Sequence, residues 1–158
     1  MHFQPGVNEE LAATAVWGSQ QTQLFQGARY DGVFGMWYGK GPGVDRSMDV
    51  IKHANAFGTA QHGGVLAVAG DDHACKSSTL PHQSEHMFIG ASVPVLAPSN
   101  VQEVLDLGIF GWELSRFSGC WVALKAITEN MDSAISADID PDRVRICLLY
   151  TSPSPRDS

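Results

Sequence analysis

The chain has 158 residues, of which 44% are hydrophobic and 17% charged, which suits a single globular domain with its own core. A net charge of −7, with basic residues scattered along the sequence, argues against a nucleic-acid-binding surface. No apolar run approaches the roughly 18–20 residues that cross a bilayer, and the N-terminus has no signal-peptide pattern. We therefore expect a cytoplasmic protein with no membrane or nucleic-acid partner.

Cys75, Cys120 and Cys147 are too few and too widely spaced for a disulfide framework, which favours a reducing compartment.

Residues 8–25 are predicted to form a helix, with Asn8 as its N-cap and two acids in the first turn. Helix capping explains those acids, Glu9 and Glu10, unless one of them is aimed at a ligand.

The remaining elements alternate between strands and helices. Apolar runs bounded by glycine or proline predict strands at 32–38, 65–69, 93–96 and 120–127. Amphipathic stretches predict helices at 44–57, 82–89 and 100–117. This order predicts an α/β domain with a parallel three-layer sheet, in which ligands bind beyond the carboxyl ends of the strands.

Two segments at predicted strand ends are candidates for chemistry. The glycine-rich cluster 39–43 precedes a helix and suits close approach of a ligand, or else makes a tight turn, and it fits neither common nucleotide motif. The segment 63–85 is an apolar run followed by a polar loop. Residues in and just beyond that loop that suit metal binding are Asp71, Asp72, His73, Cys75, His82, Glu85 and His86.

The polar loop also places serines near a histidine. Ser77 and Ser78 with His82 are a possible nucleophile and base, although no nucleophile elbow is present. An ordinary polar loop at a strand end explains these residues equally well. The metal and serine interpretations therefore stay open alternatives.

The tail differs in composition from everything before it. Residues 147–157 match the translation of a transposon-type sequencing adapter over eleven consecutive positions, so we expect 147–158 to be foreign to the domain. On this interpretation Cys147 is not a native cysteine, and residues 1–146 are a fragment of a longer protein.

Five stretches carry a resemblance to a known family. They are NEELAATAVWGSQ, GVFGMWYGKGPGVDRSMDVIKHAN, GGVLAVAGDDHACKSSTLPHQSEH, PVLAPSNVQEVLDLG and LSRFSGCWVALK. Together they resemble the indolepyruvate ferredoxin oxidoreductases, most of all the long fused bacterial form. These are thiamine diphosphate-dependent 2-oxoacid:ferredoxin oxidoreductases. The resemblance covers about residues 3–145.

The resemblance implies that residues 1–146 are the pyrimidine-binding domain of a thiamine diphosphate fold. Glu9 matches the family acid that hydrogen-bonds N1′ of the aminopyrimidine, with Glu10 as the fallback if the register is shifted by one. A carboxyl group in a water-poor pocket can share a proton with that nitrogen. Gly41, Pro42 and Gly43 match the loop beside the pyrimidine. Lys76, Ser77 or His82 would bind the substrate carboxylate.

The same resemblance implies what lies outside this chain. In the intact enzyme we expect Mg²⁺ with the cofactor diphosphate, iron–sulfur clusters, coenzyme A and ferredoxin, and a homo-oligomer that oxidatively decarboxylates an aryl 2-oxo acid to an acyl-CoA. The sequence carries neither the Gly-Asp-Gly…Asn magnesium pattern nor a cysteine cluster, so we expect the fragment to bind no metal and to be inactive alone. The alternatives are a non-catalytic α/β ligand-binding module and a zinc hydrolase built on His73, His82 and His86.

Overall fold

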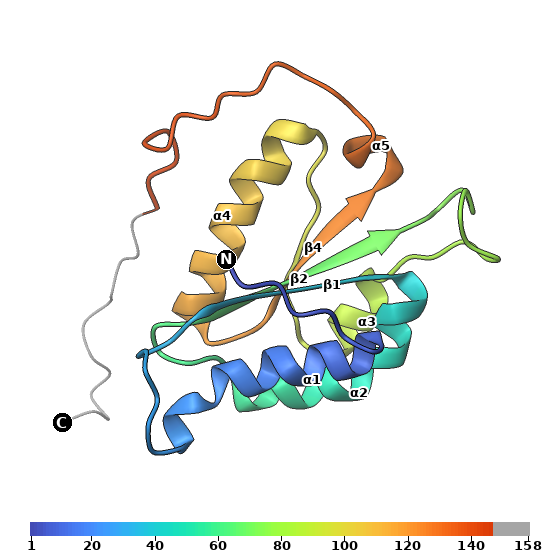
Figure 1. The fold of residues 1–158 in the computed structure, drawn as a ribbon. Coiled ribbons are helices and arrows are strands. Elements are labelled where there is room, and N and C mark those ends of the chain that lie inside the picture. Colours follow the sequence, from blue (N-terminus) through green and yellow to red (C-terminus); the bar gives the residue numbers. More distant parts are fainter. Residues whose placement is uncertain (147–158) are drawn as a thin grey trace.

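Helices and strands alternate through residues 1–146, the part of the chain that the computed structural model describes (Figure 1). The helices are α1 (Glu9–Gln20), the 3-10 helix η1 (Thr22–Leu24), α2 (Gly41–Phe57), α3 (Glu85–Gly90), α4 (Val101–Ser118) and α5 (Thr128–Met131). The strands are β1 (Phe34–Lys40), β2 (Gly64–Asp71), β3 (Val95–Leu96) and β4 (Val122–Ile127). The adapter-like tail, 147–158, lies outside the described residues.

All four strands are parallel, and their order across the sheet is β1-β2-β4-β3. Long apolar runs in the central strands account for this arrangement, because a parallel sheet is covered on both faces. The predicted α/β class is therefore confirmed. β1 forms one edge of the sheet and the two-residue β3 forms the other.

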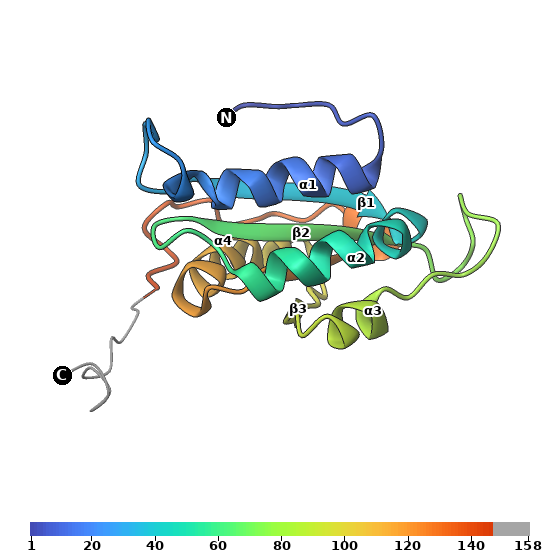
Figure 2. The same ribbon diagram turned by 90° about the horizontal axis from the view of Figure 1, so that it is seen from below.

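Helices cover both faces of the sheet (Figure 1). α1 and α2 lie side by side on one face, as the second view also shows (Figure 2), and α4 lies on the other. Alternate residues of β2 divide between the two layers: Val65, Ala67 and Ala69 join the core under α1 and α2, whereas Leu66 packs toward α4. Three layers result, as expected.

The element boundaries differ from prediction at two places that matter for the site. The first helix ends at Gln20, since the buried side chain of that residue turns inward and its Nε2 donates to the carbonyl of Val33 at 3.1 Å. The glycine cluster 39–43 is not a turn: β1 continues through Lys40, and α2 begins at Gly41. Proline at the start of a helix is favourable because its fixed φ suits the first turn.

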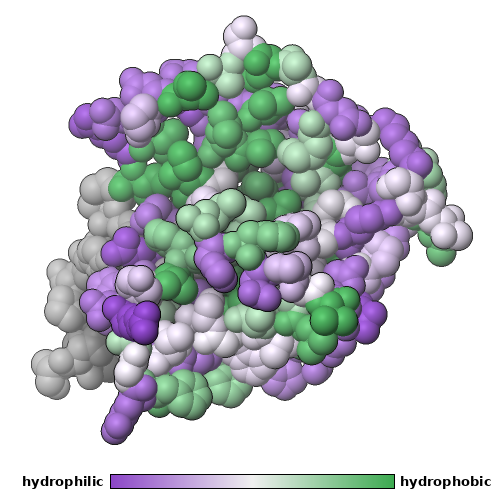
Figure 3. Space-filling model, in the orientation of Figure 1, coloured by the Kyte–Doolittle hydropathy of each residue, from purple (hydrophilic) through white to green (hydrophobic). Residues whose placement is uncertain are grey.

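Apolar side chains remain exposed near the β1 edge. Green atoms gather over α4 and β1 in Figure 3, and Phe34, Met36 and Tyr38 of β1 each expose roughly half or more of their area. Of the four tryptophans, Trp37 and Trp121 are fully buried core residues. Within residues 1–146, no helix is both long enough and apolar enough to span a membrane.

The cap of α4 gives a first prediction. The Asn100 side chain accepts a hydrogen bond from the Glu103 amide at 3.0 Å, as expected for an N-cap. Asn100→Ala should lower the free energy of unfolding by ~1 kcal/mol, because it leaves a helix-end N–H without its partner. Urea denaturation measures this change. Lys52→Ala, on the exposed side of α2, serves as the control, and an equal loss in both variants would contradict the cap assignment.

Candidate functional site

The Glu9 side chain lies where α1, β1 and α2 meet, at the carboxyl edge of the sheet. Asn8 caps α1 by accepting from the Leu11 amide at 2.9 Å, and the Trp37 indole N–H donates to the Glu9 carbonyl at 2.9 Å. The Asn8 cap fixes the start of α1, and the hydrogen bond from Trp37 holds its first turn against β1. Glu9 is half-buried, and within residues 1–146 its carboxylate makes no hydrogen bond or ion pair.

Glycine at position 43 makes room for the Glu9 carboxylate. A Cβ added to Gly43 would lie 2.6 Å from Cγ and 3.2 Å from Oε1 of Glu9, so an alanine there would push the acid away. Gly39 makes room chiefly for the Trp37 ring, which an added Cβ would approach to 2.8 Å, and the Glu9 Cγ lies further away at 3.6 Å. The glycine cluster thus forms a cradle for this acid.

The neighbouring acid points elsewhere. Glu10 lies 3.8 Å from the Arg46 guanidinium, and both side chains are about half exposed. An exposed ion pair of this kind contributes little to stability or to ligand contact. Of the two acids, only Glu9 contacts the glycine cluster within residues 1–146.

The loop after β2 folds back onto the same edge. The His82 ring packs on Gly41, where an added Cβ would lie 2.4 Å from the ring, and its Nδ1 is 3.8 Å from Asp45. Lys40 donates from Nζ to the Ser77 carbonyl at 2.7 Å and to the Ser77 hydroxyl at 3.2 Å. Two of the expected substrate residues, Ser77 and His82, are therefore brought beside the cofactor candidates Gly41 to Gly43.

Asp72 fixes the shape of this loop. Its buried carboxylate accepts from the Ser77 amide at 2.7 Å and from the Lys76 amide at 2.8 Å. These backbone hydrogen bonds, with the charge of Lys40 nearby, lower the pKa of Asp72 below its ordinary value of 3.8. The loop is thus held by an ionised carboxylate.

That anchoring should depend on pH. A carboxyl whose pKa is lowered by folding stabilises the folded loop above its ordinary pKa, and this contribution disappears as the pH falls through the folded value. We expect the amide NMR signals of Lys76 and Ser77 to move with a titration midpoint below pH 3.8. Asp72→Asn should abolish that titration. Movement centred above pH 3.8 in the wild-type chain would contradict the assignment.

A cavity of about 250 Å³ lies between this loop and the start of α2. Its lining residues are Lys40, Pro42, Ser77, Ser78, Thr79, Leu80 and His82. Lys76, the lysine singled out from the sequence, is exposed and is not among them. Lys40 was missed because it was assigned to a turn, although its place at a strand end was the available signal.

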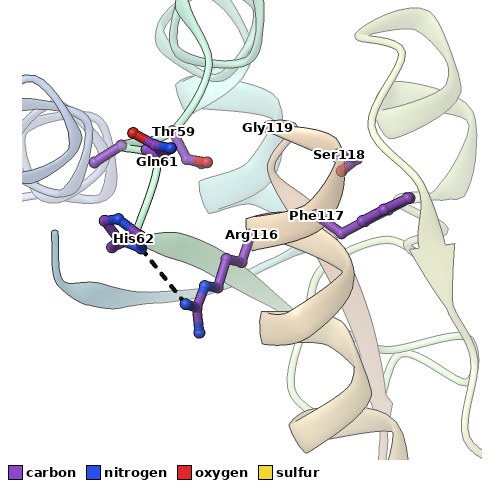
Figure 4. Close-up of a pocket in the computed structure, with 8 residues that line it drawn as sticks. Thr59, Gln61, His62, Arg116, Phe117, Ser118 and Gly119 are labelled. Atoms are coloured by element: carbon purple, nitrogen blue, oxygen red, sulfur yellow. Dashed lines mark hydrogen bonds between the residues drawn. The ribbon is translucent and has the colours of Figure 1, made fainter. Parts of the chain in front are cut away.

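A second cavity, of about 320 Å³, lies at the opposite edge of the sheet. His62 and Arg116 face one another across it, with Nδ1 and Nη2 3.5 Å apart (Figure 4). α2 and α4 both end at this edge, and Arg116 lies in the last turn of α4, where a positive charge suits the negative helix end. The end of helix α4 therefore accounts for Arg116, and the candidate site remains the carboxyl edge of the sheet.

The possible metal ligands do not come together as the zinc hypothesis requires. Ligand atoms of Asp71, His73 and Glu85 lie within 4.8 Å of one another, whereas His82 and His86 do not join this group. The Lys125 ammonium already binds Glu85, and Ser84 donates to both oxygens of Asp71. The proposed zinc triad of His73, His82 and His86 is therefore not assembled within the described residues.

Lys125 also sets the protonation of its partner. Burial alone would raise the pKa of Glu85, but the hydrogen bond and charge of Lys125, together with a backbone hydrogen bond and the nearby His73, outweigh burial and lower it. Glu85 is thus ionised and paired with an ammonium group. One of the three possible metal ligands is therefore already neutralised by Lys125.

Known proteins resemble this chain in part. The chain is similar to the indolepyruvate oxidoreductase subunit IorA. It is 30% identical over 103 residues to that subunit in Pyrococcus horikoshii and equally to that in Pyrococcus abyssi. The alignment covers 65% of this chain but only 16% of each relative, so the chain spans a small part of the proteins it matches. No family model matches the sequence.

Proposed function

We propose that residues 1–146 are the pyrimidine-binding domain of a thiamine diphosphate-dependent 2-oxo acid oxidoreductase, acting within a longer protein, and that 147–158 are not part of it. One observation carries this proposal: the Glu9 carboxylate rests on Gly43 at the carboxyl edge of the sheet, without a partner among the described residues. Similarity to IorA supports the same enzyme class.

The residues present fit an aminopyrimidine ring. A ring nitrogen needs one hydrogen-bonding partner, and Glu9 offers a carboxyl oxygen that rests on Gly43 and has no partner within residues 1–146. Gly41 and Pro42 complete the same strand-to-helix junction. When bound, thiamine diphosphate supplies the electron sink for loss of CO2 from a 2-oxo acid.

Each protein group then has a defined task. Glu9 holds a proton at its carboxyl oxygen, hydrogen-bonds the ring nitrogen, and so fixes the orientation of the ring. Gly43 keeps that carboxyl group in place, and Gly41 allows His82 to close over the junction. The substrate carboxylate would be met by the loop residues Ser77 and His82.

The remaining chemistry belongs to the proposed longer protein. Mg²⁺ with the diphosphate, the iron–sulfur clusters, coenzyme A and ferredoxin would all be bound by other domains, and indolepyruvate is the substrate that the similarity to IorA suggests. The isolated chain would then be inactive. The same proposal places the intact enzyme in the cytoplasm as a homo-oligomer.

Reconstitution tests the proposed function. The chain is mixed with a separately expressed diphosphate-binding and electron-transfer part of an indolepyruvate oxidoreductase, and 2-oxo acid-dependent reduction of a redox dye is measured. We expect turnover only when both parts and thiamine diphosphate are present. Absence of turnover, when the same parts are active with the relative's own pyrimidine domain, would favour a non-catalytic binding module.

A further inference from the structure

The cavity of about 250 Å³ beside α2 has the chemistry of an anion site. Its lining offers an ammonium group from Lys40, an imidazole from His82 and the hydroxyls of three consecutive residues, 77–79, and it contains no carboxylate. The 17-residue helix α2 begins at its wall, with the positive end of the helix directed toward the carboxyl edge. Each of these features favours a negatively charged ligand.

Two donors at this cavity have unused capacity. The Ser78 hydroxyl is buried and has no hydrogen-bond partner among residues 1–146. The Lys40 ammonium uses two of its three N–H groups on Ser77, which leaves one for a ligand. A buried polar group without a partner is costly, so a ligand oxygen that accepts from Ser78 would remove an existing penalty.

Two acids lie near the cavity. Asp72 is occupied by the amides of Lys76 and Ser77, and Asp45 lies 3.8 Å from the His82 ring. Neither carboxylate is part of the lining. The Lys40 ammonium and the His82 ring therefore both line the cavity with their neighbouring acids outside it.

We propose that this cavity binds the carboxylate of a 2-oxo acid substrate and that Lys40, rather than Lys76, is its charged anchor. This inference rests on the proposed function. The His82 ring lines the cavity and packs against Gly41. Gly43, two residues further along α2, contacts the Glu9 side chain. The substrate anchor at the end of β1 and the cofactor acid at the start of α1 thus both lie beside the first turn of α2.

Binding to the intact 158-residue chain tests the inference. Pyruvate is titrated and followed by two-dimensional NMR, with acetate and inorganic phosphate as comparison anions. We expect saturable pyruvate binding, with signals moving at residues 40–42 and 77–82. Lys40→Met should weaken binding about tenfold, the loss expected for one charged hydrogen bond, and Lys40→Arg should weaken it less. Lys76→Met, the matched control on the exposed part of the loop, should leave binding unchanged.

The outcomes separate this inference from the proposed function. No saturable pyruvate binding, or equal binding by Lys40→Met with a native-like spectrum, would overturn the anchor role. Equal affinity for phosphate and pyruvate would overturn recognition of a 2-oxo acid. Pyruvate binding that needs Lys40, in a chain that fails to bind an aminopyrimidine, would retain the cavity as a carboxylate site while removing the thiamine diphosphate assignment.

Discussion

Glu9→Gln is expected to reduce 2-oxo acid turnover of the reconstituted enzyme by about 10²–10³-fold, with the fold intact. The amide keeps the size of the side chain but cannot hold and return a proton at the ring nitrogen. Steady-state dye reduction at saturating thiamine diphosphate measures the effect. No stabilising contact is lost, since the Glu9 carboxylate has no partner within residues 1–146.

Glu10→Gln is the matched control for that experiment. Glu10 is the next residue of the same helix turn, and it faces Arg46 on the exposed surface. We expect turnover close to wild type in this variant. A large loss with Glu10→Gln and little loss with Glu9→Gln would assign the role to the wrong acid.

Gly43→Ala should change stability and activity in opposite directions. Alanine replaces glycine inside helix α2, which favours the helix by up to about 1 kcal/mol. The new Cβ would stand 2.6 Å from the Glu9 Cγ, so the flexible acid must move aside. Displacement of a catalytic group by about 1 Å can cost on the order of 10²-fold in rate.

Gly18→Ala provides the comparison, because Gly18 lies in helix α1 with no atom within 4 Å of an added Cβ. This variant should gain similar stability and keep full turnover. Thermal unfolding and dye reduction are measured on both proteins. Full activity in Gly43→Ala would show that the glycine cradle does not position Glu9.

Sequence patterns alone were sufficient for most of the fold. Apolar runs such as 65–69 are unmistakable as buried strands, and the predicted helix 100–117 matches α4 closely. The alternative of a tight turn at 39–43 was wrong. Glycines and proline usually break helices and strands, whereas here they let β1 pass directly into α2. The role of Gly41 and Gly43 is to leave room for the side chains of His82 and Glu9, which are distant in sequence.

The site was harder to predict for the same reason. Glu9 was proposed from a resemblance, and its contact with Gly43 is visible only in the folded chain. Lys40 was overlooked, because no local pattern reveals that its ammonium meets Ser77, 37 residues away. Likewise, the pairing of Glu85 with Lys125 joins two elements 40 residues apart, so the loop alone suggested a metal site.

Titration of the chain with 4-amino-5-hydroxymethyl-2-methylpyrimidine, the pyrimidine half of thiamine, tests the central claim most directly. It needs neither the diphosphate half nor a metal. The account predicts saturable NMR shifts centred on residues 9 and 39–43, lost in Glu9→Gln and retained in Glu10→Gln. Shifts centred elsewhere, or binding unaffected by Glu9→Gln, would contradict the claim that Glu9 on its glycine cradle receives the pyrimidine ring.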